Sequence, residues 1–142
     1  MSKTETIAPA QEAWMLLLDL VGSHRATIVA TAAEHDLSPM QAFALRRLEP
    51  GRPLPMNELA DVLGCDASNV TGIVDRLEVR GLVERRADER DRRVRNLAVT
   101  AEGAAVREDL LRRMHTPPAE IAALSPTDQR RLRDVLRHAL ER

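Results

Sequence analysis

Apolar side chains recur along much of this chain with the spacing of amphipathic helices. Over residues 9–35 they spread around more than one face, which predicts a long helix with a further covered surface. Residues 39–49 follow Ser38, carry a proline at the first position and Gln41 at the third, and end at Pro50-Gly51. These start and stop signals predict a second helix.

The middle of the chain predicts two helices joined by a tight turn, over residues 56–63 and 67 to about 80. Gly64 in the turn tolerates a positive φ, Asp66 is a helix cap, and Ala60 is small enough for the two helices to cross closely. The positions expected to point inward are Leu59, Leu63, Cys65, Val70 and Ile73. This spacing is typical of a helix-turn-helix.

Two short strands and two further helices complete the pattern. Residues 82–86 and 94–99 are rich in branched side chains, and the polar segment 87–93 predicts a hairpin tip between them. Capped helices are expected over residues 101–115 and 126–140, and a short extended segment over 52–54. The predicted fold is mostly α with a small wing: about six helices and an antiparallel sheet of two to three strands.

Charge is unevenly distributed along the chain. The formal net charge is -1, yet eight arginines accompany five acids between Arg76 and Arg95. A local excess of cations indicates an anionic partner. Trp14 and Phe43 are the only aromatic residues, which leaves few faces for stacking single-stranded bases. The expected partner is therefore double-stranded DNA.

The amino-terminal half of the second helix of the helix-turn-helix is expected to enter the major groove. An arginine at the hairpin tip suits the narrow minor groove, where negative potential is focused. We expect Arg90 to make that contact, with Asp88 as its brace. Arg85 and the arginines near it are interpreted as phosphate contacts or surface ion pairs. The residues expected to bind DNA are Ser68, Asn69, Thr71, Arg76, Arg86, Arg90, Arg92, Arg93 and Arg95.

Residues 68–103 resemble the core of a MarR-family transcriptional regulator. The resemblance lies in SNVTGIVDRLEVRG, followed by LVERRADERDRRVRNLAVTAEG with its Asp-x-Arg-Asp wing, Leu-x-x-Thr strand end and Glu-Gly. It covers residues 35–142 in motif or layout and 9–35 in layout only. It implies a homodimer that binds a pseudo-palindromic operator through two recognition helices and two wings. Half-sites about one helical turn apart follow from the two-fold symmetry.

The resemblance also implies a division of the chain, which we expect to be a single domain over residues 1–142. Residues 36–99 would form the winged helix-turn-helix DNA-binding lobe, and residues 9–35 and 100–142 the helical dimerization region. The broad apolar surface of the first helix and the apolar stripe of the last would be exposed in a monomer, which agrees with a homodimer.

A small effector is implied by the same resemblance. Family members commonly release DNA when a small, often phenolic or anionic, ligand binds between the dimerization helices and the DNA-binding lobe. The expected function is thus a repressor released by such a ligand. By the resemblance, the crevice would be lined by Trp14, Leu18, Phe43, Arg46 and Arg47. At such positions packing in the core or exposure on the surface is the commoner role.

The sequence leaves two alternative functions open and disfavours a third, that of an enzyme. A winged helix that binds protein is the main alternative, and a redox- or metal-responsive regulator is another. Cys65 lies at an inward position, where a thiol behaves as a small hydrophobe, and the four histidines lack the short spacing that sets two ligands on one metal. The chain has no glycine-rich phosphate loop, nucleophile elbow or isolated carboxylate pair, so no enzyme and no cofactor is expected.

The location expected from the sequence is cytoplasmic. One cysteine makes no internal disulfide, and no apolar run follows an amino-terminal basic cluster. The longest apolar run, over residues 13–18, is far shorter than the roughly 20 residues of a membrane span. We therefore expect no membrane role, and a loose leader over residues 1–8.

Overall fold

The computed structural model describes residues 7–141, so most of the expected loose leader lies outside the described residues. The three strands are β1 (Leu54–Pro55), β2 (Val83–Ala87) and β3 (Arg95–Val99). The helices are α1 (Pro9–Ser23), α2 (Arg25–Glu34), α3 (Pro39–Arg47), α4 (Met56–Leu63), α5 (Ala67–Val79), α6 (Ala101–Met114), α7 (Ala119–Ala122) and α8 (Pro126–Leu140). The predicted mostly helical fold with a small antiparallel wing is confirmed.

Two details of the helices differ from the prediction. The first predicted helix is interrupted at His24, whose φ of -98° and ψ of 0° separate α1 from α2. The four-residue α7 was not predicted, because one turn of helix is too short to show a hydrophobic period. The extended segment near residue 54 pairs with the wing and becomes β1.

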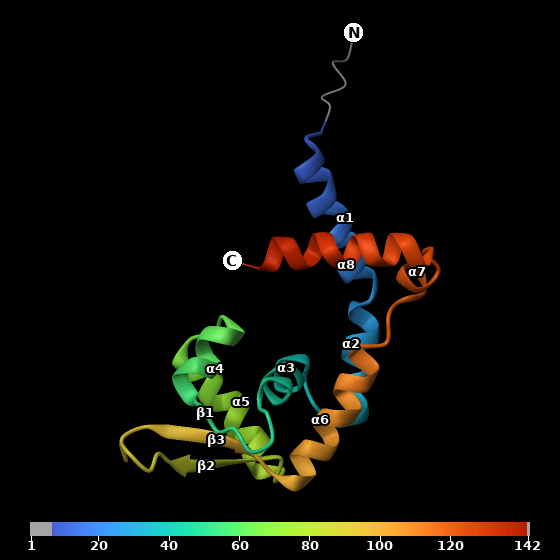
Figure 1. Cartoon of the computed structure of the whole chain (residues 1–142). Coiled ribbons are helices and arrows are strands. Elements are labelled where there is room, and N and C mark those ends of the chain that lie inside the picture. Colours follow the sequence, from blue (N-terminus) through green and yellow to red (C-terminus); the bar gives the residue numbers. More distant parts are fainter. Residues whose placement is uncertain (1–6, 142) are drawn as a thin grey trace.

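The sheet holds the wing against the helices. β3 lies in the centre, with β1 and β2 antiparallel on either side of it. Leu97 of β3 pairs with Leu54 of β1 and with Arg85 of β2, and its own side chain is fully buried. The hairpin of β2 and β3 projects beyond the helices in Figure 1, so its tip is free to approach a partner.

The core of the described residues lies where α3, α4 and α5 meet the sheet and α6. Leu59 and Val70, two of the predicted inward positions, are buried completely or almost so. Ala60, Leu63, Cys65 and Ile73 are half-buried against the same core. Gly64 adopts a φ of 62° in the turn, as expected of a residue at a left-handed position. The helix-turn-helix packing predicted from the sequence is confirmed.

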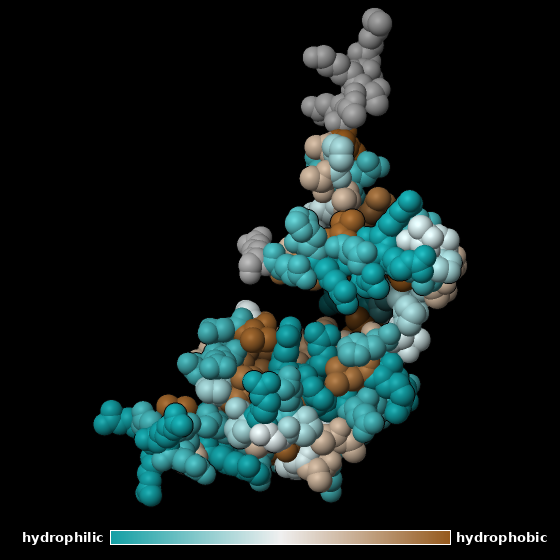
Figure 2. Space-filling view, viewed as in Figure 1, coloured by the Kyte–Doolittle hydropathy of each residue, from teal (hydrophilic) through white to brown (hydrophobic). Residues whose placement is uncertain are grey.

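Helices α1 and α8 stand apart from this core. Figure 1 shows α8 crossing α1 at the end of the molecule far from the wing, and Figure 2 shows apolar surface where they meet. Neither helix has a buried residue in this single chain. Trp14 and Val21 of α1 are 61% and 62% exposed, and Val135 of α8 is 67% exposed. These helices leave a large apolar surface without a cover.

One helical stretch has the length and apolar composition of a membrane span, although no membrane role is expected from the sequence. Helices α1 and α2, with His24 between them, together span 26 residues, and their most apolar 18-residue window has a mean hydropathy of 1.2, with 11% of that window buried. By length and composition alone this stretch could cross a membrane. Sequence inspection missed it because Asp19 and other polar residues interrupt the apolar run. An amphipathic helix awaiting a protein partner has the same composition.

Candidate nucleic-acid interface

Helix α5 exposes the polar face that was expected to read DNA. Val70, Val74 and Leu77 turn toward the core, so the opposite face is left to solvent. Asp66 caps the helix by accepting a hydrogen bond from the backbone N–H of Asn69 at 2.9 Å. That hydrogen bond, and then the one from the Ser68 hydroxyl, hold the pKa of the Asp66 carboxyl below its usual range.

The expected recognition residues Ser68, Asn69, Thr71 and Arg76 are all exposed on α5. The Ser68 hydroxyl donates to Asp66 Oδ1 at 2.9 Å, and the Thr71 hydroxyl donates to the Ala67 carbonyl at 2.9 Å. With their protons engaged, these two hydroxyls offer only acceptors in this conformation. Asn69 and Arg76 lie two turns apart on one flank of the helix. Their side-chain donors make no hydrogen bond to other described residues.

Asp88 organises the wing tip. Its Oδ1 accepts hydrogen bonds from the backbone N–H groups of Arg90 at 2.7 Å and Asp91 at 3.1 Å, and its Oδ2 accepts one from the Asn96 amide at 3.0 Å. The pKa of the Asp88 carboxyl is lowered, first by the Arg90 N–H and then by Asn96. Asp88 therefore holds the backbone of the tip, whereas the sequence suggested a brace for the Arg90 side chain.

The structure divides the arginines of this region into those that form ion pairs and those that are available to a partner, which the sequence could not do. Arg85 is half-buried and pairs with Asp75 and Glu78 of α5, and Arg86 pairs with Glu84 on its own strand. None of the ion pairs among residues 7–141 involves the other wing arginines or Arg76. These exposed and available cations are Arg76, Arg90, Arg92, Arg93 and Arg95.

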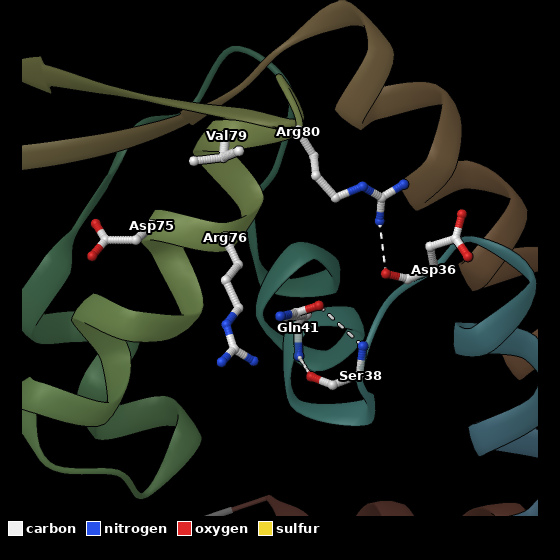
Figure 3. A pocket seen from close by; sticks show the side chains of 7 residues that line it. All are labelled: Asp36, Ser38, Gln41, Asp75, Arg76, Val79 and Arg80. Carbon is white, nitrogen blue, oxygen red and sulfur yellow. Dashed lines mark hydrogen bonds between the residues drawn. The ribbon is translucent and has the colours of Figure 1, made fainter.

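A hollow of about 530 Å³ lies between the start of α3 and α5. Figure 3 shows Arg76 pointing into it and Arg80 reaching toward Asp36. Arg80 donates to the carbonyls of His35 at 2.6 Å and Asp36 at 3.0 Å, so it closes the end of α2. Ser38 and Gln41 form the predicted capping box at the same place. Of the two arginines that line this hollow, Arg80 is engaged by backbone carbonyls, whereas the donors of Arg76 make no hydrogen bond to other described residues.

The five residues expected to line an effector crevice are not brought together as a cavity. Trp14 and Leu18 are exposed on α1, and the Arg46 guanidinium lies 5.9 Å from the centre of the Phe43 ring on α3, where Arg47 is exposed. An apolar crevice of about 580 Å³ opens elsewhere, between α1 and α2 on one side and α6 to α8 on the other. Its lining includes Leu17, Val21, Ile28, Met114, Ile121 and Leu136. Sequence reasoning missed α7 and hence this crevice.

The thiol and two of the four imidazoles have ordinary partners. Half-buried Cys65 lies with its sulfur 3.5 Å from the Leu63 carbonyl oxygen. His24 contacts Glu120 at 3.2 Å, and His35 contacts Asp109 at 2.7 Å. Within the part of the chain that the structure describes, three or more potential metal ligands nowhere cluster.

A helix-turn-helix followed by a hairpin whose tip carries unpaired arginines defines a winged helix-turn-helix protein. The MarR family model matches residues 35–94, which contain the helix-turn-helix, β2 and the wing tip and end just before β3. A probable transcriptional regulator from Pseudomonas aeruginosa has a solved structure that is 31% identical, with 87% of this chain and 94% of that chain covered and a TM-score of 0.66.

One further relative supports this assignment, and a second solved structure shares the fold. The transcriptional repressor MprA of Escherichia coli K12 is 36% identical over 87 residues, 61% of this chain and 49% of that protein. The crystal structure of wild-type MarR from E. coli, in its apo form, superimposes with a TM-score of 0.77, 22% identity and coverage of 96% and 99% of the two chains. The chain belongs to the MarR family of transcriptional regulators.

Proposed function

We propose that this protein is a homodimeric repressor that binds a pseudo-palindromic operator in double-stranded DNA. The observation that carries the proposal is the combination of an exposed polar face on α5 with a wing whose tip arginines have no ion pair among the described residues. Side-chain donors on such a helix suit base edges in the major groove, and arginines on the wing suit phosphates and the minor groove. The repressor names of family relatives support the direction of regulation.

The contacts are divided as follows. Asn69 and Arg76 read bases because their donors are free, and Ser68 and Thr71 contribute as acceptors or by close packing. Arg90 enters the minor groove from a tip whose backbone Asp88 holds. Arg92, Arg93 and Arg95 contact phosphate. Arg86 contributes less than these three, because its guanidinium already pairs with Glu84.

The dimer uses the surface that a single chain leaves uncovered. Residues 9–35 and 100–142 form the dimerization region, and residues 36–99 form the DNA-binding lobe. Large exposed apolar patches on a folded protein mark association surfaces. The exposed apolar side chains of α1 and the apolar stripe of α8 supply such a patch, and a second copy related by two-fold symmetry covers both at once. This cover also accounts for the apolar composition of residues 9–34 without a membrane, in keeping with a cytoplasmic regulator.

An effector completes the proposal. The apolar crevice between α1 and α2 on one side and α6 to α8 on the other suits a small, phenolic or anionic, molecule whose ring is buried. Arg113, which also pairs with Glu34 and Asp109, is the arginine in its lining. Trp14, Leu18, Phe43, Arg46 and Arg47 stay candidates from the family resemblance. Ligand binding there would shift the DNA-binding lobe relative to the dimerization region and lower the affinity for the operator.

Selection of duplexes from a randomised library by the full chain tests the function. We expect enrichment of a pseudo-palindrome with half-sites about one helical turn apart. Its binding constant should fall linearly with salt on logarithmic axes, and sedimentation should show a dimer. A protein that enriches no duplex, or that binds DNA only as a monomer, would contradict the proposal. Failure to bind any duplex would favour the protein-binding winged helix instead.

A further inference from the structure

One wing arginine is held in a different way from the others. Arg85 lies on β2, and its guanidinium spans two carboxylates of the recognition helix, Asp75 Oδ1 at 2.5 Å and Glu78 Oε1 at 2.6 Å. Its side chain is only 23% exposed, whereas that of its neighbour Arg86 is 59% exposed. The planar guanidinium is suited to holding two carboxylates at once.

The backbone takes part in the same connection. The N–H of Arg85 donates to Glu78 Oε2 at 3.1 Å, so Glu78 accepts from both the main chain and the side chain of one residue. Hydrogen bonding to Asp75, and then to Glu78, raises the pKa of the Arg85 guanidinium. Three contacts therefore join the outer face of α5 to the strand that carries the wing.

The two acids of this connection lie where a DNA-binding helix would be expected to avoid negative charge. Asp75 and Glu78 lie on the exposed side of a helix that is proposed to approach phosphates, and acids there repel DNA. A carboxylate on this side of the helix weakens DNA binding, so its presence calls for a separate structural role. Here both carboxylates hold Arg85, and the pairing takes the donors of Arg85 away from any phosphate.

We propose that Arg85 is a positioning residue, which fixes the angle between the recognition helix α5 and the wing through Asp75 and Glu78. The inference rests on the proposed DNA-binding function. Helix and wing enter neighbouring grooves of one duplex, so the two contacts form together only if their relative orientation is set beforehand. A preset orientation spares the entropy that a loose wing would lose on binding. Specific affinity therefore depends on two acids that touch no DNA.

Asp75→Asn is the decisive variant, because simple electrostatics and positioning predict opposite results. Removal of a negative charge near DNA should strengthen binding, whereas loss of the Arg85 contact should weaken it. We expect about tenfold weaker binding, which corresponds to about 1.4 kcal/mol. The probe is the duplex that the wild-type protein selects from a randomised library. On an unselected duplex of equal length the affinity should be unchanged or higher, since non-specific binding is set by charge and does not require helix and wing to be aligned.

Glu89→Gln is the matched control. Glu89 is an exposed acid on the wing tip, and its carboxylate makes no ion pair within residues 7–141. Its neutralisation removes the same charge as Asp75→Asn without touching Arg85, so binding should be unchanged or tighter. If Glu89→Gln weakens binding to the selected duplex as much as Asp75→Asn does, the proposal is overturned.

Arg85→Lys separates positioning from phosphate contact. Lysine keeps the charge but presents one ammonium, which cannot hold two carboxylates as a guanidinium does. We expect Arg85→Lys to lose affinity about as much as Asp75→Asn, with the salt slope of the wild type. Wild-type affinity for Arg85→Lys, together with a slope about 0.9 lower for Arg85→Ala, would show a phosphate contact instead.

A measurement without DNA distinguishes failure of this inference from failure of the proposed function. Amide hydrogen exchange of the free protein should be faster in β2 and β3 of Asp75→Asn than in the wild type, with an unchanged melting temperature as evidence of folding. Unchanged exchange overturns the inference even if DNA binding holds. Faster exchange in a protein that selects no duplex would refute only the proposed function, and leave Arg85 as the link between helix and wing.

Discussion

Gly103, near the start of α6, lies tightly against Leu82 and against Val99 of β3. A Cβ built there would lie 1.8 Å from the Leu82 carbonyl oxygen, 2.8 Å from its carbonyl carbon and 2.8 Å from Val99 Cγ2. The carbonyl cannot move aside without cost, because it accepts a hydrogen bond from the Thr100 N–H at 3.1 Å. Leu82 itself is only 4% exposed. The added methyl group of Gly103→Ala must therefore displace α6 from Leu82 and from β3.

The expected destabilisation follows from two opposing contributions. Alanine is favoured over glycine in a helix by up to about 1 kcal/mol. Overpacking a tight site costs about 1 to 3 kcal/mol, and a contact against fixed backbone belongs at the upper end. We therefore expect Gly103→Ala to lower the free energy of unfolding by about 1 to 2 kcal/mol. For a chain of this length that is a fall of roughly 3 to 7 °C in melting temperature.

Gly72→Ala is the control for this prediction. Gly72 lies within α5, and nothing stands within 4 Å of the Cβ that alanine would add. Its melting temperature should rise, because only the helix preference acts. Both variants are compared with the wild type by calorimetry at one protein concentration, since a dimer melts at a concentration-dependent temperature. A melting temperature for Gly103→Ala at or above that of the wild type would refute the steric reasoning.

Further predictions concern DNA binding and the dependence of stability on pH. Arg90→Ala should weaken binding to the selected duplex by about 1 to 3 kcal/mol in fluorescence anisotropy, with the fold intact; unchanged affinity removes Arg90 from the interface. Asn69→Ala should alter the preferred base in a new selection, whereas Arg95→Ala should weaken all duplexes alike; equal behaviour of the two would end that division of roles. The pKa of Asp109 is lowered, first by its hydrogen bond with His35, so its stabilising effect is present above about pH 3.9 and is lost as pH falls. In urea titrations the difference in unfolding free energy between wild type and Asp109→Asn should be smaller at about pH 3 than at about pH 6; an equal difference at the two pH values contradicts this.

Much of the helical fold could be predicted because its signals are local. Four helices begin at a capping side chain that accepts a hydrogen bond from the backbone N–H three residues later: Ser38, Asp66, Thr100 and Ser125. A few neighbouring residues in the sequence therefore suffice to recognise the start of each helix. Gly64 also acts locally, since only its own backbone needs the left-handed conformation. The wing sequence was similarly informative, and the family comparison confirms the assignment.

Only the tertiary structure decided which charges are free. Arg85 and Arg90 look alike in sequence, yet Arg85 pairs with acids ten and seven residues earlier on another element, whereas Arg90 has its backbone held and its guanidinium exposed. Folding brought these acids to β2, and many pairings of nearly equal energy were open to the chain beforehand. Residue type and local spacing set the helices and turns, because those depend on neighbours in sequence. The partners of each arginine, and the crevice that α7 helps to line, depend on packing between distant segments.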